Sequence, residues 1–279
     1  MKRSTKIALL LAAAMILLGL ILSYAALVFT GGIPMPNGEA ATHQITEDFS
    51  HITIELDTTD VQFLRSPDDT CKVVFTETDK YRHRAEVQND TLFIGFNDRR
   101  QWFDHISIFG TPSMKAEVYL PRDRYLSLTV ETDTGDMEIP GGFLFSFAEL
   151  ETDTGDIFWQ ADLSGKLSVD TDTGKISLSD MSAAMVELDT DTGDVSLSNV
   201  VTLKEIAIET DTGDVVFDRV DGESIFVETN TGDVSGTVLT DKLFRAESDT
   251  GHVRIPWDTV GGKCTVITDT GDVDLSVAE

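Results

Sequence analysis

The sequence predicts an all-β fold: a single-stranded parallel β-solenoid (β-helix) with one coil per repeat, preceded by one transmembrane helix. Two observations support the solenoid. A pentapeptide close to TDTGD occurs eight times between residues 132 and 272, with its glycines 19 or 20 residues apart, and apolar and polar residues alternate on both sides of each glycine. A unit this short cannot bury an apolar face alone, so stacking of the repeats is expected.

Each repeat can be described around its glycine. Apolar residues lie seven and five positions before it and two and four after it, as Val186, Leu188, Val195 and Leu197 do around Gly193. This alternation predicts two half-buried strands joined at a corner, and a third apolar position seven to nine residues after the glycine predicts a looser return. We expect glycine at the corner because a positive φ is easy only for glycine. The predicted corner residues are Gly135, Gly155, Gly174, Gly193, Gly213, Gly232, Gly251 and Gly271.

Stacked coils would lie about 4.8 Å apart and wind in the right-handed sense that parallel crossovers favour. The alternative is a meander or propeller of hairpins, but hairpin turns prefer Asn-Gly or Asp-Gly and threonine is poor at positive φ. Residues 52–63 are interpreted as a degenerate copy of the repeat, with Thr59 in the place of the glycine. Because Thr59 lies 76 residues before Gly135, close to four periods, about twelve coils are expected.

The N-terminal residues differ from the rest. The basic start MKRSTK precedes an apolar run, residues 7–29, long enough to cross a ~30 Å bilayer as a helix. We therefore expect a single-pass protein of the cell membrane with a cytoplasmic N-terminus and an extracytoplasmic bulk. A cleaved signal peptide is the alternative, since residues 23–25 include small residues. The predicted organisation is a cytoplasmic tail at 1–6, the transmembrane helix at 7–29, a linker at 30–44, degenerate first coils at 45–125 and regular repeats at 126–279. Within the degenerate part, residues 97–113 are expected to be either a loop that covers the solenoid or a contact surface.

Acidic residues outnumber basic ones by 49 to 21, and the formal net charge is −28. This charge argues against nucleic acid as a partner and suits cations, basic proteins or simple solubility. In stacked coils the aspartates two positions before each glycine would form a column in which neighbours repel by roughly 1 kcal/mol. The column is either hydrated or it binds Ca²⁺, the one cofactor considered. The aspartates two positions before and one position after each glycine are also expected to accept backbone N–H groups in Asx-type turns. The candidate calcium ligands are Asp133, Asp153, Asp172, Asp191, Asp211, Asp249 and Asp269.

No catalytic residue is predicted. The five histidines are not at ligand or triad spacing, and from Gly135 onward the period leaves no long loop to build a cleft. A polysaccharide-acting β-helix enzyme is therefore the alternative that fits least. Cys71 and Cys264 are expected as small core residues without a disulfide.

The TDTGDV units and residues 116–140, AEVYLPRDRYLSLTVETDTGDMEIP, resemble the bacterial "putative adhesin" β-strand-repeat domain family of unknown function over about residues 45–277. The resemblance implies a β-solenoid, often membrane-anchored, with a role in adhesion or the cell envelope and no defined catalytic or ligand residues. We therefore expect a binding or structural scaffold that is not an enzyme. The expected partners are the membrane through the N-terminal helix, an envelope protein or glycan contacted by residues such as Glu131, Glu151 and Glu209, and other copies of the protein through the solenoid ends.

Overall fold

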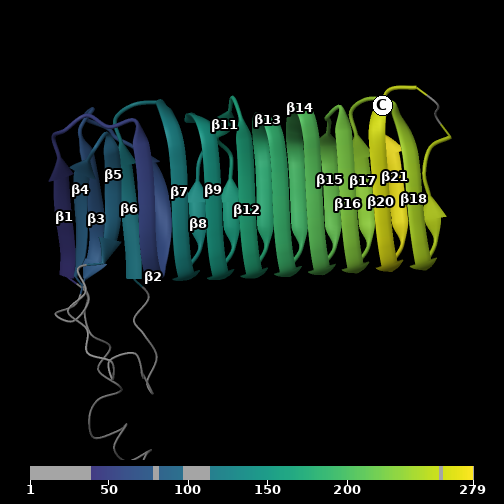
Figure 1. The fold of residues 1–279 in the computed structure, drawn as a ribbon, viewed down its shortest axis with the longest axis horizontal. Helices are drawn as coiled ribbons and strands as arrows, with labels where there is room; N and C mark the ends of the chain where they lie inside the picture. Colours follow the sequence, from purple (N-terminus) through teal and green to yellow (C-terminus); the bar gives the residue numbers. More distant parts are fainter. Residues whose placement is uncertain (1–38, 78–81, 97–113, 258–259, 279) are drawn as a thin grey trace, which may run out of the picture. The chain divides into compact units, whose positions relative to one another are not determined.

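A computed structural model describes residues 39–77, 82–96, 114–257 and 260–278 (Figure 1). All regular secondary structure in these residues is β-strand, in one 21-stranded sheet within the compact unit that spans residues 38–279. The strands are β1 Glu39–Ile45, β2 His51–Arg65, β3 Cys71–Glu77, β4 His83–Gln88, β5 Thr91–Phe96, β6 Met114–Leu120, β7 Arg124–Thr134, β8 Met137–Ile139, β9 Leu144–Thr154, β10 Ile157–Trp159, β11 Asp162–Leu163, β12 Lys166–Thr173, β13 Ile176–Thr192, β14 Val195–Thr212, β15 Val215–Val220, β16 Ser224–Thr231, β17 Val234–Val238, β18 Lys242–Thr250, β19 Val253–Arg254, β20 Gly262–Thr270 and β21 Val273–Val277.

The repeats stack in register, each one forming a layer. Before the corner, Leu167 of β12 pairs with Ala148 of β9 on one side and with Val186 of β13 on the other. At the corner the ladder continues, since the N–H of Gly174 donates to the carbonyl of Thr192 in the next layer at 3.0 Å. The predicted alternation is confirmed: the residues seven, five and three positions before the glycine and two and four after it form the core of most layers.

The predicted fold class is nevertheless wrong as stated. The sheet is mixed, because β1 and β3, β3 and β6, and β4 and β5 pair antiparallel. The parallel pairs also close on themselves in a ring of seven strands. Strand β2 continues past the corner at Thr59, and β13 continues past a second bend at Asp180, so each belongs to two sides of the stack. The ring runs through β2, β7, β9, β12, β13, β10 and β8 and back to β2. The fold is a closed parallel arrangement with extra strands, built from solenoid-like repeats.

The prediction of a preceding transmembrane helix also needs correction. Residues 7–29 lie outside the described residues, and the part of the chain that the structure describes contains no helix long and apolar enough to cross a membrane. The fold class is therefore corrected to an all-β unit with no such helix in the described residues. The single-pass cell-membrane localisation depended on this helix, and the described residues do not support it.

The 76 residues between Thr59 and Gly135 do not hold four coils, because these two residues are neighbours in the stack. Strand β2 pairs with β7, with Ile52 opposite Leu128, and with β5 and β6 on its other side. The chain between them leaves the stack, forms the antiparallel strands and returns. Asn89 and Asp90, with φ of 50° and 65°, join β4 to β5 in a two-residue hairpin turn, which needs positive φ at both positions. The corner column therefore holds nine positions, not about twelve. Segment 97–113 lies outside the described residues.

The last two repeats are exchanged in the stack. Strand β20 lies between β16 and β18, because Val266 pairs with Val227 on one side and with Ala246 on the other. Strand β21 lies between β17 and β19 in the same way. Figure 1 shows β18 as the outermost strand at this end, with β20 and β21 inside it. The final repeat in sequence is therefore not the outer layer, contrary to the order expected of consecutive coils.

A buried lysine connects the two layers that flank this inserted repeat. The Lys242 side chain is 3% exposed, and its Nζ donates to Asp221 Oδ1, to the Gly222 carbonyl at 2.8 Å and to Thr240 Oγ1 at 2.8 Å. Lys242 itself pairs with Gly262 of the inserted strand. A buried ammonium is costly unless it is paired and hydrogen-bonded, so this network holds β18 at its two-layer distance from β16.

Candidate functional site: an acidic face across the layers

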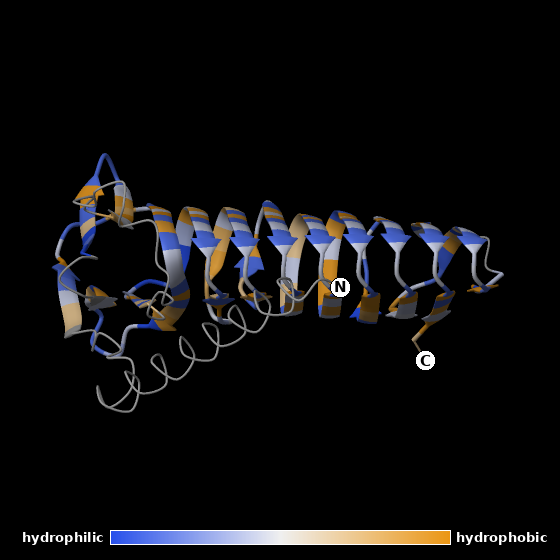
Figure 2. Cartoon of the chain, turned by 90° about the horizontal axis from the view of Figure 1, so that it is seen from below, coloured by the Kyte–Doolittle hydropathy of each residue, from blue (hydrophilic) through white to orange (hydrophobic). Residues whose placement is uncertain are grey.

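Two columns of carboxylates run side by side across the outer surface of the strands that precede the corners. The first column lies two positions before the glycine and contains the seven aspartates predicted as calcium ligands, all exposed. The second lies four positions before the glycine and is also exposed. We call the two columns together the acidic face. In Figure 2 the tips of these strands are hydrophilic from layer to layer. The second column consists of Glu55, Glu131, Glu151, Asp170, Asp189, Glu209, Glu228 and Glu247.

Backbone register places these charges one layer apart. Asp189 pairs with Asp170 on one side and with Glu209 on the other. Two neutral residues interrupt the columns: Ile267 lies between Glu228 and Glu247, and Asn230 Nδ2 donates to Asp211 Oδ1 at 2.8 Å. The face is therefore a nearly unbroken array of like charges.

The array changes the acidity of its central members. Partial burial, followed by the charges of Asp172 and Asp191, raises the pKa of Asp170. Partial burial, followed by Asp170 and Glu209, raises the pKa of Asp189. The pKa of Glu151 is raised for the same reasons. A raised carboxyl pKa means that the charged form is disfavoured in the folded protein, so these groups would gain from a bound cation.

We expect Asp189→Asn to raise the free energy of unfolding by roughly 0.5–1 kcal/mol at pH 7 and low salt, because it removes one of several stacked like charges. The raised pKa means that the folded state binds this proton more tightly than the unfolded chain. Ionisation therefore destabilises the folded protein above the folded-state pKa, and this effect disappears below the ordinary value of 3.8. The gain should shrink to nothing as the pH falls from 7 to below 3.8.

Thermal melting of the variant and the natural protein across this pH range measures the difference. Asp123→Asn, an exposed aspartate just before β7 and outside the acidic face, is the matched control. A stability gain for Asp189→Asn that is independent of pH, or an equal gain for the control, would contradict the interpretation.

The aspartates that follow the glycine have a structural role. Asp136 Oδ1 accepts the backbone N–H of Asp156 at 2.8 Å, and Asp156 Oδ1 accepts that of Lys175 at 2.9 Å. The same bond joins Asp214 to Asp194 at 3.1 Å. The predicted acceptance of backbone N–H groups by aspartate is thus present at this position, and the donor belongs to the neighbouring layer. These carboxylates stabilise the stacking of the layers.

The corner glycines are needed for a different reason from the one predicted. Among the eight, only Gly271 has a positive φ, of 159°. The constraint is close stacking: a Cβ on Gly193 would lie 1.8 Å from the carbonyl oxygen of Gly174, and one on Gly213 would lie 1.9 Å from that of Gly193. The corners approach too closely for any side chain. The structure has left-handed residues at a second corner that the sequence analysis missed, Asp180, Asn199 and Arg219, with φ between 52° and 60°.

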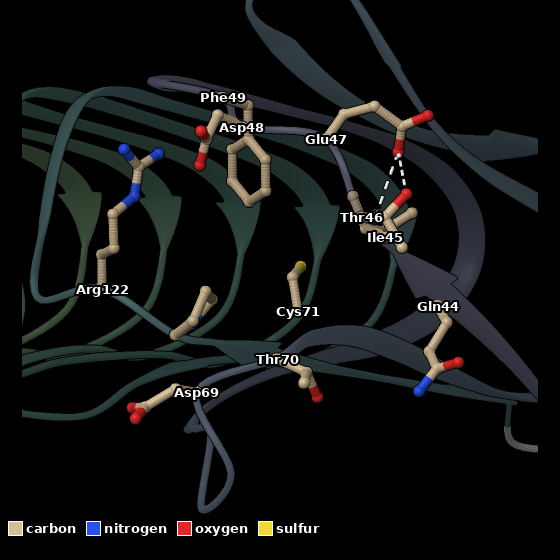
Figure 3. Close-up of a pocket in the computed structure, with 11 residues that line it drawn as sticks. Gln44, Ile45, Thr46, Glu47, Asp48, Phe49, Asp69, Thr70, Cys71 and Arg122 are labelled. Atoms are coloured by element: carbon tan, nitrogen blue, oxygen red, sulfur yellow. Dashed lines mark hydrogen bonds between the residues drawn. The ribbon is translucent and has the colours of Figure 1, made fainter.

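A separate hollow of about 400 Å³ lies beside β1 and β3 (Figure 3). Arg122 lies at its edge, with its guanidinium 5.7 Å from the ring centre of Phe49, and Glu47 and Asp48 add negative charge. Burial raises the pKa of the Cys71 thiol in its wall to about 12. A thiol with this pKa stays protonated at neutral pH, so Cys71 is not an activated nucleophile. Cys71 and Cys264 are both buried and free, which confirms the prediction for them.

The fold and these surfaces define an all-β repeat protein with a long, regular acidic face. The chain belongs to the Toastrack DUF4097 family, which it matches over residues 49–279. This match confirms the resemblance found in the TDTGDV units. Among curated proteins, none matched the sequence.

Two of three solved structures with a similar fold are described as adhesins and one as a lipid binding protein. A "putative adhesin" from Bacteroides fragilis NCTC 9343 is 14% identical with a TM-score of 0.56, covering 86% of this chain and 99% of its own. A second "putative adhesin", from Parabacteroides distasonis ATCC 8503, is 15% identical with a TM-score of 0.54, and the match covers 86% of this chain and 98% of that one. A "putative lipid binding protein" from the same organism is 13% identical with a TM-score of 0.55, also covering 86% and 98%. These likenesses establish a shared fold, and none of the three is described as an enzyme.

Proposed function

We propose that this Toastrack domain is an adhesin-like binding scaffold whose acidic face binds a cationic partner, such as a basic segment of an envelope protein. The observation that supports this function is the pair of exposed carboxylate columns that continue from layer to layer in register. A rigid stack holds these charges at fixed spacing, so a partner does not have to order them on binding.

The layer spacing suggests how a basic segment would lie. A polyproline II segment has three residues per turn and rises about 3.1 Å per residue, so lysines at every third residue lie on one side and recur at about 9 Å, close to two layers of about 4.8 Å. A segment lying along the stack with this lysine spacing could pair with alternate layers of the acidic face.

Binding of a fluorescent peptide with lysine at every third residue tests the proposal. Combined Glu131→Gln, Glu151→Gln and Glu209→Gln substitutions should weaken binding at least tenfold at low salt, and added salt should weaken binding to the natural protein. The matched control makes the same change in net charge at exposed positions near the starts of the strands, Asp123→Asn, Glu223→Gln and Asp241→Asn. Equal losses in both variants would show only a response to net charge, and unchanged binding by the first variant would reject the face as the site.

Calcium is a second candidate occupant of the acidic face. The seven aspartates of the first column, and the raised pKa of Asp170 and Asp189 beside them, favour a cation there. In the described residues, however, no group of three or more His, Cys, Asp or Glu side chains could hold a metal ion, so binding would be weak. Thermal melting in millimolar CaCl₂, compared with NaCl at equal ionic strength, decides this. No stabilisation beyond that produced by NaCl would reject calcium binding.

A further inference from the structure

The layer formed by β18 and β19 leaves part of the core uncovered. In the described part of the chain, β18 pairs only with β20, and β19 pairs only with β21. Phe244 and Ala246 of β18 are half-buried and Val253 of β19 is 43% exposed. The residues that pair with them in the next layer are at most 1% exposed: Cys264, Val266 and Val273. The uncovered layer therefore presents both apolar side chains and an unpaired strand edge.

This edge lacks several devices that usually prevent pairing with another chain. Natural edge strands are often short, contain proline or are bent by a bulge. β18 has nine residues without proline, and it pairs with β20 without a shift of register. An edge of this kind is competent to accept a further strand.

The charges on the outer surface of β18 favour a particular partner strand for its free edge. Arg245 and Glu247 are two residues apart on the same side of the strand, with side chains 79% and 65% exposed. Their own ion pair is long, 3.9 Å, and at this exposure contributes little to stability. Both charges are available to groups on a neighbouring strand.

We propose that β18 pairs with β18 of a second copy of this chain, antiparallel about a two-fold axis, with Ala246 opposite Ala246 of the partner subunit. In this register Arg245 lies opposite the partner's Glu247, and the symmetry repeats the pair in the opposite direction. Phe244 lies opposite the partner's Ser248, so large and small side chains meet on the core side. Opposite charges across neighbouring strands stabilise a sheet.

Neighbouring registers are disfavoured by the same charges. Because side chains alternate between the two faces, only shifts that keep Phe244 and Ala246 on the core side are allowed. A symmetric shift in one direction places Arg245 opposite Arg245 of the partner subunit, and a shift in the other places Glu247 opposite the partner's Glu247. Like charges directly opposite one another are destabilising.

A second copy bound in this way gives a closed dimer. The interface uses the same strand in both subunits, so no further edge of this type remains. The opposite end of the domain is built from antiparallel strands such as β1 and β4 rather than from a repeat layer. Head-to-tail stacking would therefore have to join unlike edges, and it would produce open filaments.

Analytical ultracentrifugation of the full chain over a range of concentrations tests the proposal. The natural protein should form dimers and nothing larger. Arg245→Glu and Glu247→Arg should each weaken dimerisation about tenfold or more, because each places like charges opposite one another twice in the dimer. Both positions are exposed, and circular dichroism of each variant checks that folding is retained.

Two complementation experiments make the test specific. The double substitution Arg245→Glu with Glu247→Arg should restore dimerisation, and mixing the two single variants should produce a heterodimer, since each then supplies the charges that the other lacks. A natural protein that is monomeric at all concentrations, that forms filaments, or whose dimers are unaffected by the single substitutions would overturn the proposal.

Discussion

Ending the chain at Gly261 removes β20 and β21, and we expect the remaining strands β18 and β19 to unfold as a result. In the described structure β18 depends on β20 for its strand pairing, and the removed repeat fills the space between the layers. The deletion also removes the buried side chains Cys264, Val266, Val273 and Leu275. Burial of each aliphatic side chain contributes about 1.5–3 kcal/mol, so the lost burial approaches the whole stability of an ordinary domain. Limited proteolysis with mass spectrometry should detect rapid cleavage within residues 242–257.

A chain that ends at Asp241 is the control for this truncation. It removes the outer and the inserted layers together and leaves a stack that ends at β16 and β17, which lose β20 and β21 on one side but keep their pairing with β14 and β15 on the other. Although it is shorter, it should resist proteolysis and melt at least as high as the chain that ends at Gly261. Full protection of residues 242–254 in the longer truncation would contradict the prediction, because it would mean that β18 can move onto β16.

Gly193→Ala is expected to destabilise the domain by about 3 kcal/mol, the upper end of the usual range for overpacking. The added Cβ would lie 1.8 Å from the Gly174 carbonyl oxygen and 2.6 Å from its carbon, and both atoms belong to a backbone held by strand pairing. Relief of this contact would require two layers to separate at the corner. Thermal melting should show a decrease of roughly 6–12 °C for a domain of this size.

Gly141→Ala is the matched control for the corner substitution. A Cβ there meets its nearest neighbour, the Gln160 carbonyl oxygen, at 3.6 Å, an ordinary contact distance. This variant should melt within a few degrees of the natural protein. Equal effects of the two substitutions would show that backbone flexibility, and not close stacking, explains the corner glycines.

Much of the individual layer could be predicted from the sequence. The alternation around Gly193 specifies which side chains face inward, because successive residues of a strand point to opposite sides whatever its neighbours are. Thr190, three positions before the glycine, is buried as this alternation requires. The first carboxylate column was predicted as candidate ligands, and Glu131, Glu151 and Glu209 of the second were predicted as contact residues. The continuity of the acidic face follows from the same alternation once the repeats stack.

The reason for the corner glycine could not be obtained in the same way. A positive φ and a close approach of two backbones both select glycine, and the sequence does not distinguish them. Only the distance between stacked layers shows that the second reason applies at Gly193. The hairpin at Asn89 and Asp90 was not predicted, because residues 45–125 were interpreted as degenerate coils, although Asn and Asp are residues that such turns favour.

The sequence by itself determined the repeat, the inward and outward faces of its strands, its family and its acidic surface, because each of these depends on local periodicity or composition. The tertiary structure alone decided which layer lies next to which: that Thr59 contacts Gly135 across 76 residues, and that β20 inserts between β16 and β18. The physical reason is that every repeat presents nearly the same strand edge and the same apolar face. Local pattern therefore cannot rank its possible neighbours, and the order depends on long-range contacts such as the Lys242 network.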